Sequence, residues 1–230
     1  NIGPMAIISH DNEFIFVHIP KTAGTSISEA LTREPTITSQ KIKRKLKHLP
    51  SLINPNQPTH PKLITPKVEK HAKAIKIKQK VGNTLWDNYF TFSFVRNPWD
   101  LMVSSYKWWL QKAHMWPHLA QDIKCIKNMD GFKTFLKSPY GTNMINEHQG
   151  TIMDWLTDEK YTIIVDYIGK VETLDRDFKK VCKKLAINQP ALPRINVTNR
   201  YDYRSYYDSE SRQWITERFS KTIEQFGYTF

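Results

Sequence analysis

A lysine, a glycine and several hydroxyl residues directly after an apolar run carry the most informative chemistry in the chain. Residues 14–17 are apolar, and residues 21–26, which follow Pro20, read Lys-Thr-Ala-Gly-Thr-Ser. A strand, a small-residue loop and a helix N-terminus together bind phosphate, because backbone N–H groups and the helix dipole attract an anion and lysine adds a full positive charge. We therefore predict a phosphate site made by Lys21, Thr22, Ala23, Gly24, Thr25 and Ser26.

This loop differs from the Walker A loop of nucleotide-dependent kinases. In Walker A the lysine follows the second glycine and adjoins the Ser or Thr that holds magnesium. Here Lys21 precedes Gly24, and no glycine lies five residues before Gly24. We expect a phosphate cradle without a metal site of its own. A P-loop-type kinase remains an alternative, with Thr22 as the metal-holding hydroxyl.

A second segment places an arginine and a serine where they could bind another phosphate. Residues 90–95 read Phe-Thr-Phe-Ser-Phe-Val and predict a second core strand, and Pro98 suits the first turn of a following helix. Arg96 would then lie at the carboxyl end of the strand, where ligands bind in open α/β sheets. Its guanidinium can form a fork to a phosphate to which Ser104 also donates. Alternatively, Arg96 pairs with a carboxylate; we interpret Asp100 as a partner of the helix dipole.

The two segments together resemble the PAPS-dependent sulfotransferases, in particular the carbohydrate branch of chondroitin, dermatan and heparan enzymes and their bacterial relatives. Val-His-Ile-Pro-Lys-Thr-Ala-Gly-Thr-Ser and Phe-Val-Arg-Asn-Pro-Trp-Asp…Ser-Ser-Tyr carry this resemblance. Further stretches follow in the family's order: Lys70-His71-Ala72 with Ile75-Lys76, residues 167–174, residues 192–198, residues 206–208 and residues 226–230. Within the third of these, Arg194 stands where histidine is commoner in the family.

The resemblance implies a donor, a product and a set of roles. The donor is PAPS, the product is PAP, and no metal is required. The first loop would hold the 5′-phosphosulfate, with Lys21 stabilising the leaving group. Arg96 and Ser104, eight residues apart, would hold the 3′-phosphate. Arg200 would cover the nucleotide as a C-terminal clamp.

A histidine is the candidate general base for such a transfer. The acceptor hydroxyl must lose its proton as it attacks sulfur, and imidazole is the side chain best suited to this near neutral pH. His71 matches a histidine of the family, and His18, directly before the loop, is the second candidate. Glu147 and His148 lie where substrate contacts are expected.

The composition is basic, with a formal net charge of +12. Lysine and arginine concentrate in residues 41–47 and 62–80. These blocks suit a polyanionic donor and an anionic acceptor, and a solvated surface is the alternative interpretation. We expect a hydroxyl-bearing acceptor, a carbohydrate, with no nucleic-acid partner. A basic nucleic-acid-binding module is the remaining alternative function, and the oligomeric state is left open.

The elements that position these residues predict an α/β fold. We expect residues 1–230 to form a single domain, with a mainly parallel sheet flanked by helices around a P-loop-like nucleotide-binding core. The proline-rich residues 34–66 predict an irregular insertion and candidate substrate loop, and residues 1–4 resemble an expression-vector remnant. No apolar run approaches the roughly 18 residues of a membrane span. We expect a cytoplasmic enzyme of bacterial type, or the lumenal domain of a Golgi enzyme.

The remaining expectations concern particular segments and the two cysteines. Cys125 and Cys182 are expected as free thiols in or near the core, which suits a reducing compartment. Ser209 is expected as the N-cap of the last helix and Gly227 as its stop. We predict strands at residues 14–18 and 161–168; helices at residues 25–33, 69–81, from 98, 175–186 and 209–226; and helices with a substrate-facing loop within residues 111–160.

Overall fold

Four strands form one mainly parallel sheet in the computed structural model, which describes residues 7–32, 68–111, 113–143, 150–195 and 201–230. The strands lie in the order β1 (Ile7–Ser9), β2 (Phe14–Val17), β3 (Phe90–Val95) and β4 (Tyr167–Lys170). β1 pairs antiparallel with β2, whereas β2, β3 and β4 run parallel. The carboxyl ends of these three strands therefore meet at one edge of the sheet.

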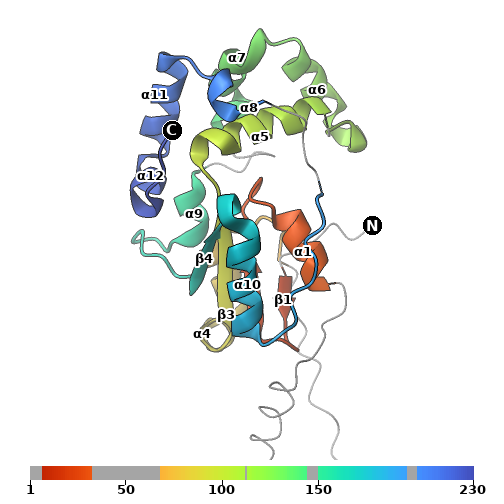
Figure 1. Ribbon diagram of the computed structural model, residues 1–230, viewed down its shortest axis with the longest axis vertical. Helices are drawn as coiled ribbons and strands as arrows, with labels where there is room; N and C mark the ends of the chain where they lie inside the picture. Colours follow the sequence, from red (N-terminus) through yellow and green to blue (C-terminus); the bar gives the residue numbers. More distant parts are fainter. Residues whose placement is uncertain (1–6, 33–67, 112, 144–149, 196–200) are drawn as a thin grey trace, which may run out of the picture.

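Helices cover both faces of the sheet because both faces are apolar. Successive side chains of a strand point to opposite faces, so the phenylalanines of β2 and β3 share one face. There they pack against α1 (Gly24–Thr32) and α10 (Leu174–Leu185). The other face packs against α3 (Ala74–Val81), α4 (Asn83–Asn88) and α9 (Ile152–Leu156). Figure 1 shows α10 and α1 beside the strands.

A long helix follows β3 and passes across the carboxyl edge of the sheet. This helix, α5 (Pro98–Gln111), separates the sheet from a group of shorter helices in Figure 1. The remaining elements are η1 (Ala113–Met115), η2 (Pro117–Leu119), α6 (Ala120–Lys127), α7 (Gly131–Lys137), α8 (Pro139–Thr142), η3 (Val171–Thr173), η4 (Tyr203–Tyr206), α11 (Ser209–Arg218) and α12 (Ser220–Phe226). The α/β class predicted from the sequence is confirmed.

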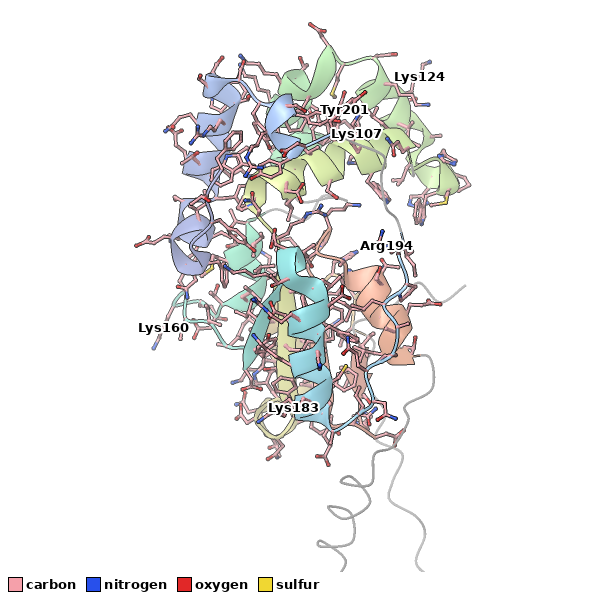
Figure 2. All side chains as sticks on the ribbon, in the orientation of Figure 1. Lys107, Lys124, Lys160, Lys183, Arg194 and Tyr201 are labelled. Carbon is pink, nitrogen blue, oxygen red and sulfur yellow. The ribbon has the colours of Figure 1, made fainter. Side chains whose placement is uncertain are left out.

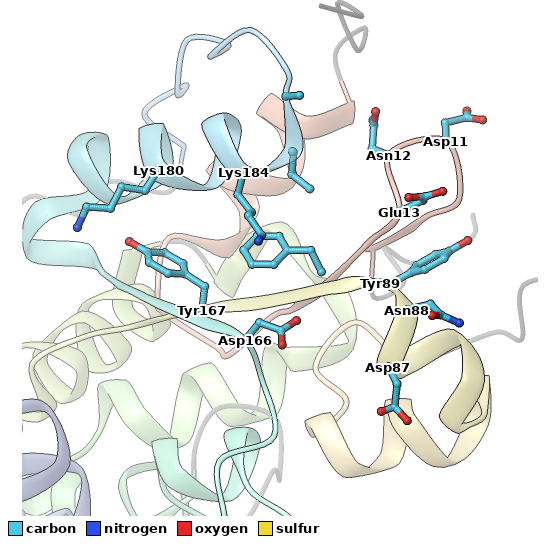
Figure 3. Close-up of a pocket in the computed structure, with 13 residues that line it drawn as sticks. Asp11, Asn12, Glu13, Asp87, Asn88, Tyr89, Asp166, Tyr167, Lys180 and Lys184 are labelled. Atoms are coloured by element: carbon cyan, nitrogen blue, oxygen red, sulfur yellow. The ribbon is translucent and has the colours of Figure 1, made fainter. Parts of the chain in front are cut away.

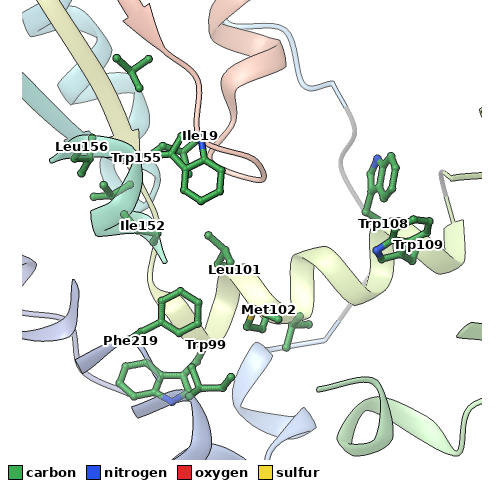
Figure 4. Packing of buried hydrophobic residues seen from close by; sticks show 14 of the residues in the cluster. Ile19, Trp99, Leu101, Met102, Trp108, Trp109, Ile152, Trp155, Leu156 and Phe219 are labelled. Carbon is green, nitrogen blue, oxygen red and sulfur yellow. The ribbon is translucent and has the colours of Figure 1, made fainter. Parts of the chain in front are cut away.

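The loop after β2 is anchored in the same core as α5. Ile19 is fully buried and belongs to one cluster with Leu101 of α5 and Trp155 of α9. Figure 4 shows these side chains in the space between the loop, α5 and α9. The chain on the carboxyl side of β2 is therefore held by packing, not only by the strand.

The predicted strand at residues 161–168 is wrong over most of its length. Only Tyr167 and Ile168 belong to β4, and Ile163 makes an isolated antiparallel bridge with Thr157. β-branched residues favour an extended, half-buried segment, but they do not determine which strand or helix that segment packs against. Here the segment packs beside the end of α9, where the Ile164 N–H donates to the Leu156 carbonyl oxygen.

Two predicted helix boundaries are also wrong. α3 begins at Ala74 and not at residue 69. The predicted helix at 209–226 is two helices, α11 and α12, interrupted at the fully buried Phe219. The N-cap of α11 is Asp208 instead of Ser209, because the Asp208 carboxylate accepts from the Ser211 N–H at 2.7 Å. Gly227 does end α12, in the left-handed conformation with φ of 62°.

Both cysteines are free thiols, but they differ in burial. Cys182 is buried in the core, as expected, and burial raises the pKa of its thiol to about 11. Cys125 is exposed, which corrects its expected place in or near the core. No helix among the described residues is long and apolar enough to cross a membrane.

Candidate active site

The loop between β2 and α1 has the backbone of an anion-binding turn. Lys21 and Ala23 both adopt positive φ, 63° and 61°, which is a costly conformation for residues with a Cβ. The first intrahelical bond of α1 is donated by the Ile27 N–H to the Ala23 carbonyl oxygen. The N–H groups of the preceding turn have no acceptor within the helix. They belong to the loop on the carboxyl side of β2, where an anion would satisfy them.

Gly24 is required at the start of α1 by the ring of His18. A Cβ on Gly24 would lie 1.9 Å from Cδ2 and 2.0 Å from Nε2 of His18. His18 is buried, stacks on Phe16 with ring centroids 5.6 Å apart, and meets His71 edge to face at 4.6 Å. The loop between β2 and α1 is therefore packed directly on the pair His18 and His71.

The hydroxyl residues of the loop have different environments. Thr22 is fully buried and donates from Oγ1 to the Ile19 carbonyl oxygen at 2.9 Å, so its hydroxyl stabilises the loop. This contact leaves the kinase alternative without the exposed hydroxyl it needs. Ser26 is also buried, and its Oγ accepts from the Ile195 N–H at 3.4 Å. Thr25 is half-buried.

Arg96 joins the two segments that the sequence predicts as phosphate sites. Its Nη1 donates to the Lys21 carbonyl oxygen at 3.1 Å and to Ser104 Oγ at 3.0 Å. Its Nε donates to Asp100 Oδ2 at 2.7 Å. Asp100 is therefore the ion-pair partner of Arg96 as well as an acidic residue in the first turn of α5. The structure brings Lys21, Arg96 and Ser104 together, and it also shows the alternative expected for Arg96, an ion pair with a carboxylate.

Trp108 lies beneath the amine of Lys21. The Lys21 Nζ is 5.4 Å from the centroid of the Trp108 ring. A cation over the face of an indole is attracted by the ring quadrupole. Trp108 is buried on α5, one turn beyond Ser104. The indole and Arg96 therefore fix Lys21 at both its side chain and its carbonyl.

Two hydrogen bonds, one from its ring and one to its backbone carbonyl oxygen, place His71 beside the loop. Its Nδ1 lies 3.2 Å from the His18 carbonyl oxygen, and its own carbonyl oxygen accepts from Trp155 Nε1 at 2.9 Å. A carbonyl oxygen only accepts, so His71 Nδ1 carries a hydrogen, which leaves Nε2 as the nitrogen that can take up or release a proton. These contacts of His71 hold residues 69–73 in a turn, so α3 begins only at Ala74.

The surroundings of the histidine pair are electrostatically positive. Burial lowers the pKa of His18 well below its ordinary value, and the neighbouring charges of His71 and Lys70 lower it further. Burial also lowers the pKa of Lys70. His18 is thus a neutral, enclosed ring, whereas His71 is half-buried. Of the two predicted bases, only His71 is partly exposed to solvent.

The end of β4 and the C-terminal residues close the far side of this edge. Glu172 Oε1 accepts from the Asn97 N–H at 2.6 Å, and Glu172 Oε2 accepts from the Tyr228 hydroxyl at 3.3 Å. Asn97 Nδ2 donates to the Thr229 carbonyl oxygen at 2.9 Å, and Lys170 Nζ donates to the Phe226 carbonyl oxygen at 2.5 Å. The Asn97 contacts hold the turn between β3 and α5, so they fix Arg96 just before the helix and Asp100 in its first turn.

Several predicted residues lie outside the described part of the chain. They are Arg200, Glu147, His148, the insertion at residues 34–66, residues 1–4 and the basic block at 41–47. Within the described ranges no group of three or more His, Cys, Asp or Glu side chains could hold a metal ion. The labelled cations Lys124, Lys160, Lys183 and Arg194 are widely separated in Figure 2.

Sequence reasoning missed the roles of Trp108, Trp155 and Lys70 around the site. Trp108 could have been suspected, because residues four apart on a helix share a face and Ser104 was already assigned there. Trp155 bonds to a residue 84 positions away. No local pattern predicts that contact.

Comparison with known proteins identifies the family. A protein-family model described as the sulfotransferase family matches residues 4–229, so the chain belongs to the sulfotransferase family. An uncharacterized protein of Archaeoglobus fulgidus is 34% identical over 129 residues, which cover 56% of this chain and 93% of that protein. The crystal structure of mouse sulfotransferase SULT7A1 complexed with PAP is 14% identical, with a TM-score of 0.52. That match covers 94% of this chain and 85% of the mouse chain, and it shows the shared fold.

Proposed function

We propose that the protein transfers the sulfonate group of PAPS to an acceptor hydroxyl on a carbohydrate. One observation carries the proposal: a single guanidinium, that of Arg96, bonds both the Lys21 carbonyl oxygen and Ser104 Oγ. This contact supports an arrangement in which the two predicted phosphate sites lie next to each other at the carboxyl edge of the sheet. The family match and the sulfotransferase fold support this function over the kinase and nucleic-acid-binding alternatives.

The loop after β2 fits the phosphosulfate end of the donor. Positive φ at Lys21 and Ala23 turns backbone N–H groups toward one side, and the start of α1 adds its dipole. The strained conformation at these two residues is a reason to expect function there. In the proposed complex, Lys21 and the N–H groups of residues 23–26 hold the 5′-phosphosulfate, with Thr25 Oγ1 as a further donor.

Arg96 and Ser104 fit the 3′-phosphate end. Arg96 is mostly buried, with 13% of its side chain exposed, and Asp100 fixes the plane of its guanidinium. Ser104 is buried beside it on α5. In the proposed complex, a guanidinium already held in place binds the phosphate through its remaining N–H groups without the entropy cost of ordering a long side chain. Arg200 remains a proposed clamp over the nucleotide.

The proposed reaction forms a bond between the acceptor oxygen and sulfur and breaks the bond from sulfur to the bridging oxygen of the donor. His71 Nε2 takes the proton of the acceptor hydroxyl. The Lys21 ammonium stabilises the negative charge that develops on the bridging oxygen as PAP leaves. Electrostatic stabilisation of this kind supplies most of the acceleration in the related phosphoryl transfers.

Positive charge beside His71 supports an anionic carbohydrate as the acceptor. Lys70 and Lys73 flank the turn that carries His71, and Lys73 Nζ lies 5.5 Å from the Trp155 ring centroid. Cations next to the proposed base would attract a carboxylated or sulfated sugar to the side where the proton is removed.

Transfer from radiolabelled PAPS to a panel of neutral and anionic glycans and small alcohols tests the function. The wild type is compared with Lys21→Ala and His71→Ala, and Lys124→Ala and His114→Ala serve as controls at exposed positions. We expect transfer to a glycan that both site variants reduce and both control variants retain. Transfer to no member of the panel by folded, PAP-binding protein would reject the carbohydrate acceptor. Undiminished turnover in His71→Ala would remove His71 from the mechanism.

A further inference from the structure

A cavity of about 880 Å³ opens at the edge of the sheet opposite the candidate active site. Its lining includes Glu13, Tyr89 and Asp166, each of which directly precedes a parallel strand. Figure 3 shows it between α10, the turn before β2 and the end of α4. Strands of this length place it about 15–20 Å from the Lys21 loop. The proposed transfer reaction does not use it.

Aromatic rings with fixed orientations form the middle of this cavity. The Tyr89 hydroxyl lies 2.6 Å from His10 Nδ1, and the two rings meet edge to face. Burial raises the pKa of Tyr167 to about 12, helped by the charge of Asp177 and a hydrogen bond to it. Phe90 is a third aromatic residue of the lining. Rings held through their far ends offer a preformed flat surface to a ligand.

One side of the cavity carries three carboxylates, those of Asp11, Glu13 and Asp87. Asp87 pairs with Lys78 at 3.3 Å, but Asp11 and Glu13 make no recorded ion pair with another described residue. Burial raises the pKa of Tyr89, and the charges of Glu13 and Asp11 raise it further. The two carboxylates therefore dominate the field around that ring.

The other side carries positive charge from α10. Lys180 is paired with Asp177 at 3.1 Å. Lys184 makes no recorded ion pair within the described ranges; its Nζ lies 5.8 Å from the Phe90 ring centroid. In Figure 3 the Lys184 amine lies between Tyr167 and Tyr89, and Asp11 and Glu13 lie on the Tyr89 side. The cavity thus carries positive charge on the α10 side and negative charge on the side of the turn before β2, and aromatic rings belong to its lining.

We propose that this cavity binds a small dipolar ligand: a sugar ring with an amine at one end and an anionic group at the other. The amine would pair with Asp11 and Glu13, the anionic group with Lys184, and the ring would lie on Tyr89 and Tyr167. A ligand that carries both a cationic and an anionic group would pair with the carboxylates and with the lysine at the same time. The site is distinct from the donor site and from the acceptor side at His71.

Calorimetric titration with four matched sugars tests the proposal on the full chain. Glucosamine 6-phosphate carries both charges, glucosamine only the amine, glucose 6-phosphate only the phosphate, and glucose neither. We expect glucosamine 6-phosphate to bind at least about tenfold more tightly than either singly charged sugar, since each charge-assisted hydrogen bond contributes about this much. Equal binding by all four sugars, or binding by none, would overturn the proposal.

Two variants locate the binding on the cavity. Lys184→Gln should reduce the preference for the phosphate, and Glu13→Gln the preference for the amine, each by about tenfold. Lys179→Gln, on the same helix but outside the lining, and Glu159→Gln are the exposed controls. PAP binding should be unchanged in all four variants. Effects from the controls equal to those from the lining variants would place the sugar elsewhere and refute the site.

Discussion

Gly24→Ala tests whether the loop between β2 and α1 is packed on His18 as the structure shows. The added methyl group would lie 1.9 Å from His18 Cδ2, about 1.5 Å inside ordinary contact at 3.4 Å. The ring cannot move away freely, because Phe16 stacks on one side of it and His71 meets it at 4.6 Å. Gly24 does not need its special backbone freedom, and alanine is the better helix former. The clash alone therefore makes the substitution destabilising.

Overpacking of this kind costs about 1–3 kcal/mol, which urea unfolding measures directly. We expect Gly24→Ala to lower the free energy of unfolding by that amount and to weaken PAP binding. The same substitution in a His18→Ala background should cost almost nothing, because the space is then empty. The double-mutant cycle isolates the contact between the two residues. An equal cost in both backgrounds would refute the packing argument.

Three further predictions address charge at the site. Lys21→Ala should raise the barrier of the transfer step by about 2–4 kcal/mol, by analogy with the loss of one oxyanion donor. Single-turnover kinetics measure this barrier, and an unchanged rate would exclude Lys21 from the step. Asp100→Asn should weaken PAP binding about tenfold in calorimetry, because Arg96 loses its ion pair at 2.7 Å; unchanged affinity would mean that Asp100 does not orient Arg96. Because burial lowers the pKa of His18 well below 6.5, the unfolded chain takes up a proton there that the folded protein does not. Wild-type stability should therefore fall as the pH drops below 6.5, and less steeply in His18→Gln; equal slopes in urea unfolding at a series of pH values would contradict this.

The part of the site made by neighbouring elements was predictable from the sequence. Arg96 ends a strand that the Phe-Thr-Phe-Ser-Phe-Val run identifies, and Ser104 lies two turns into the next helix. The two residues meet at 3.0 Å because strand and helix geometry are regular over this short span. The Lys21 loop meets them because parallel strands end at one edge.

Contacts between distant segments were not predictable in the same way. His71 reaches the His18 carbonyl oxygen across 53 residues, and the turn that this contact stabilises shortens the predicted helix at 69–81. The β-branched residues 162–165 lie beside the end of α9 and outside the sheet, because tertiary partners decide how such a segment is used. Asp100 illustrates an intermediate case. Its spacing of four from Arg96 was visible, but the pairing depends on the turn that begins α5.

A crystal structure of the protein with PAP, without added magnesium, tests the central claim most directly. The account predicts the 3′-phosphate within hydrogen-bond distance of Arg96 and Ser104, and the 5′-phosphate on the N–H groups of residues 23–26 with Lys21 beside it. PAP bound elsewhere, or with neither phosphate at these residues, would contradict it.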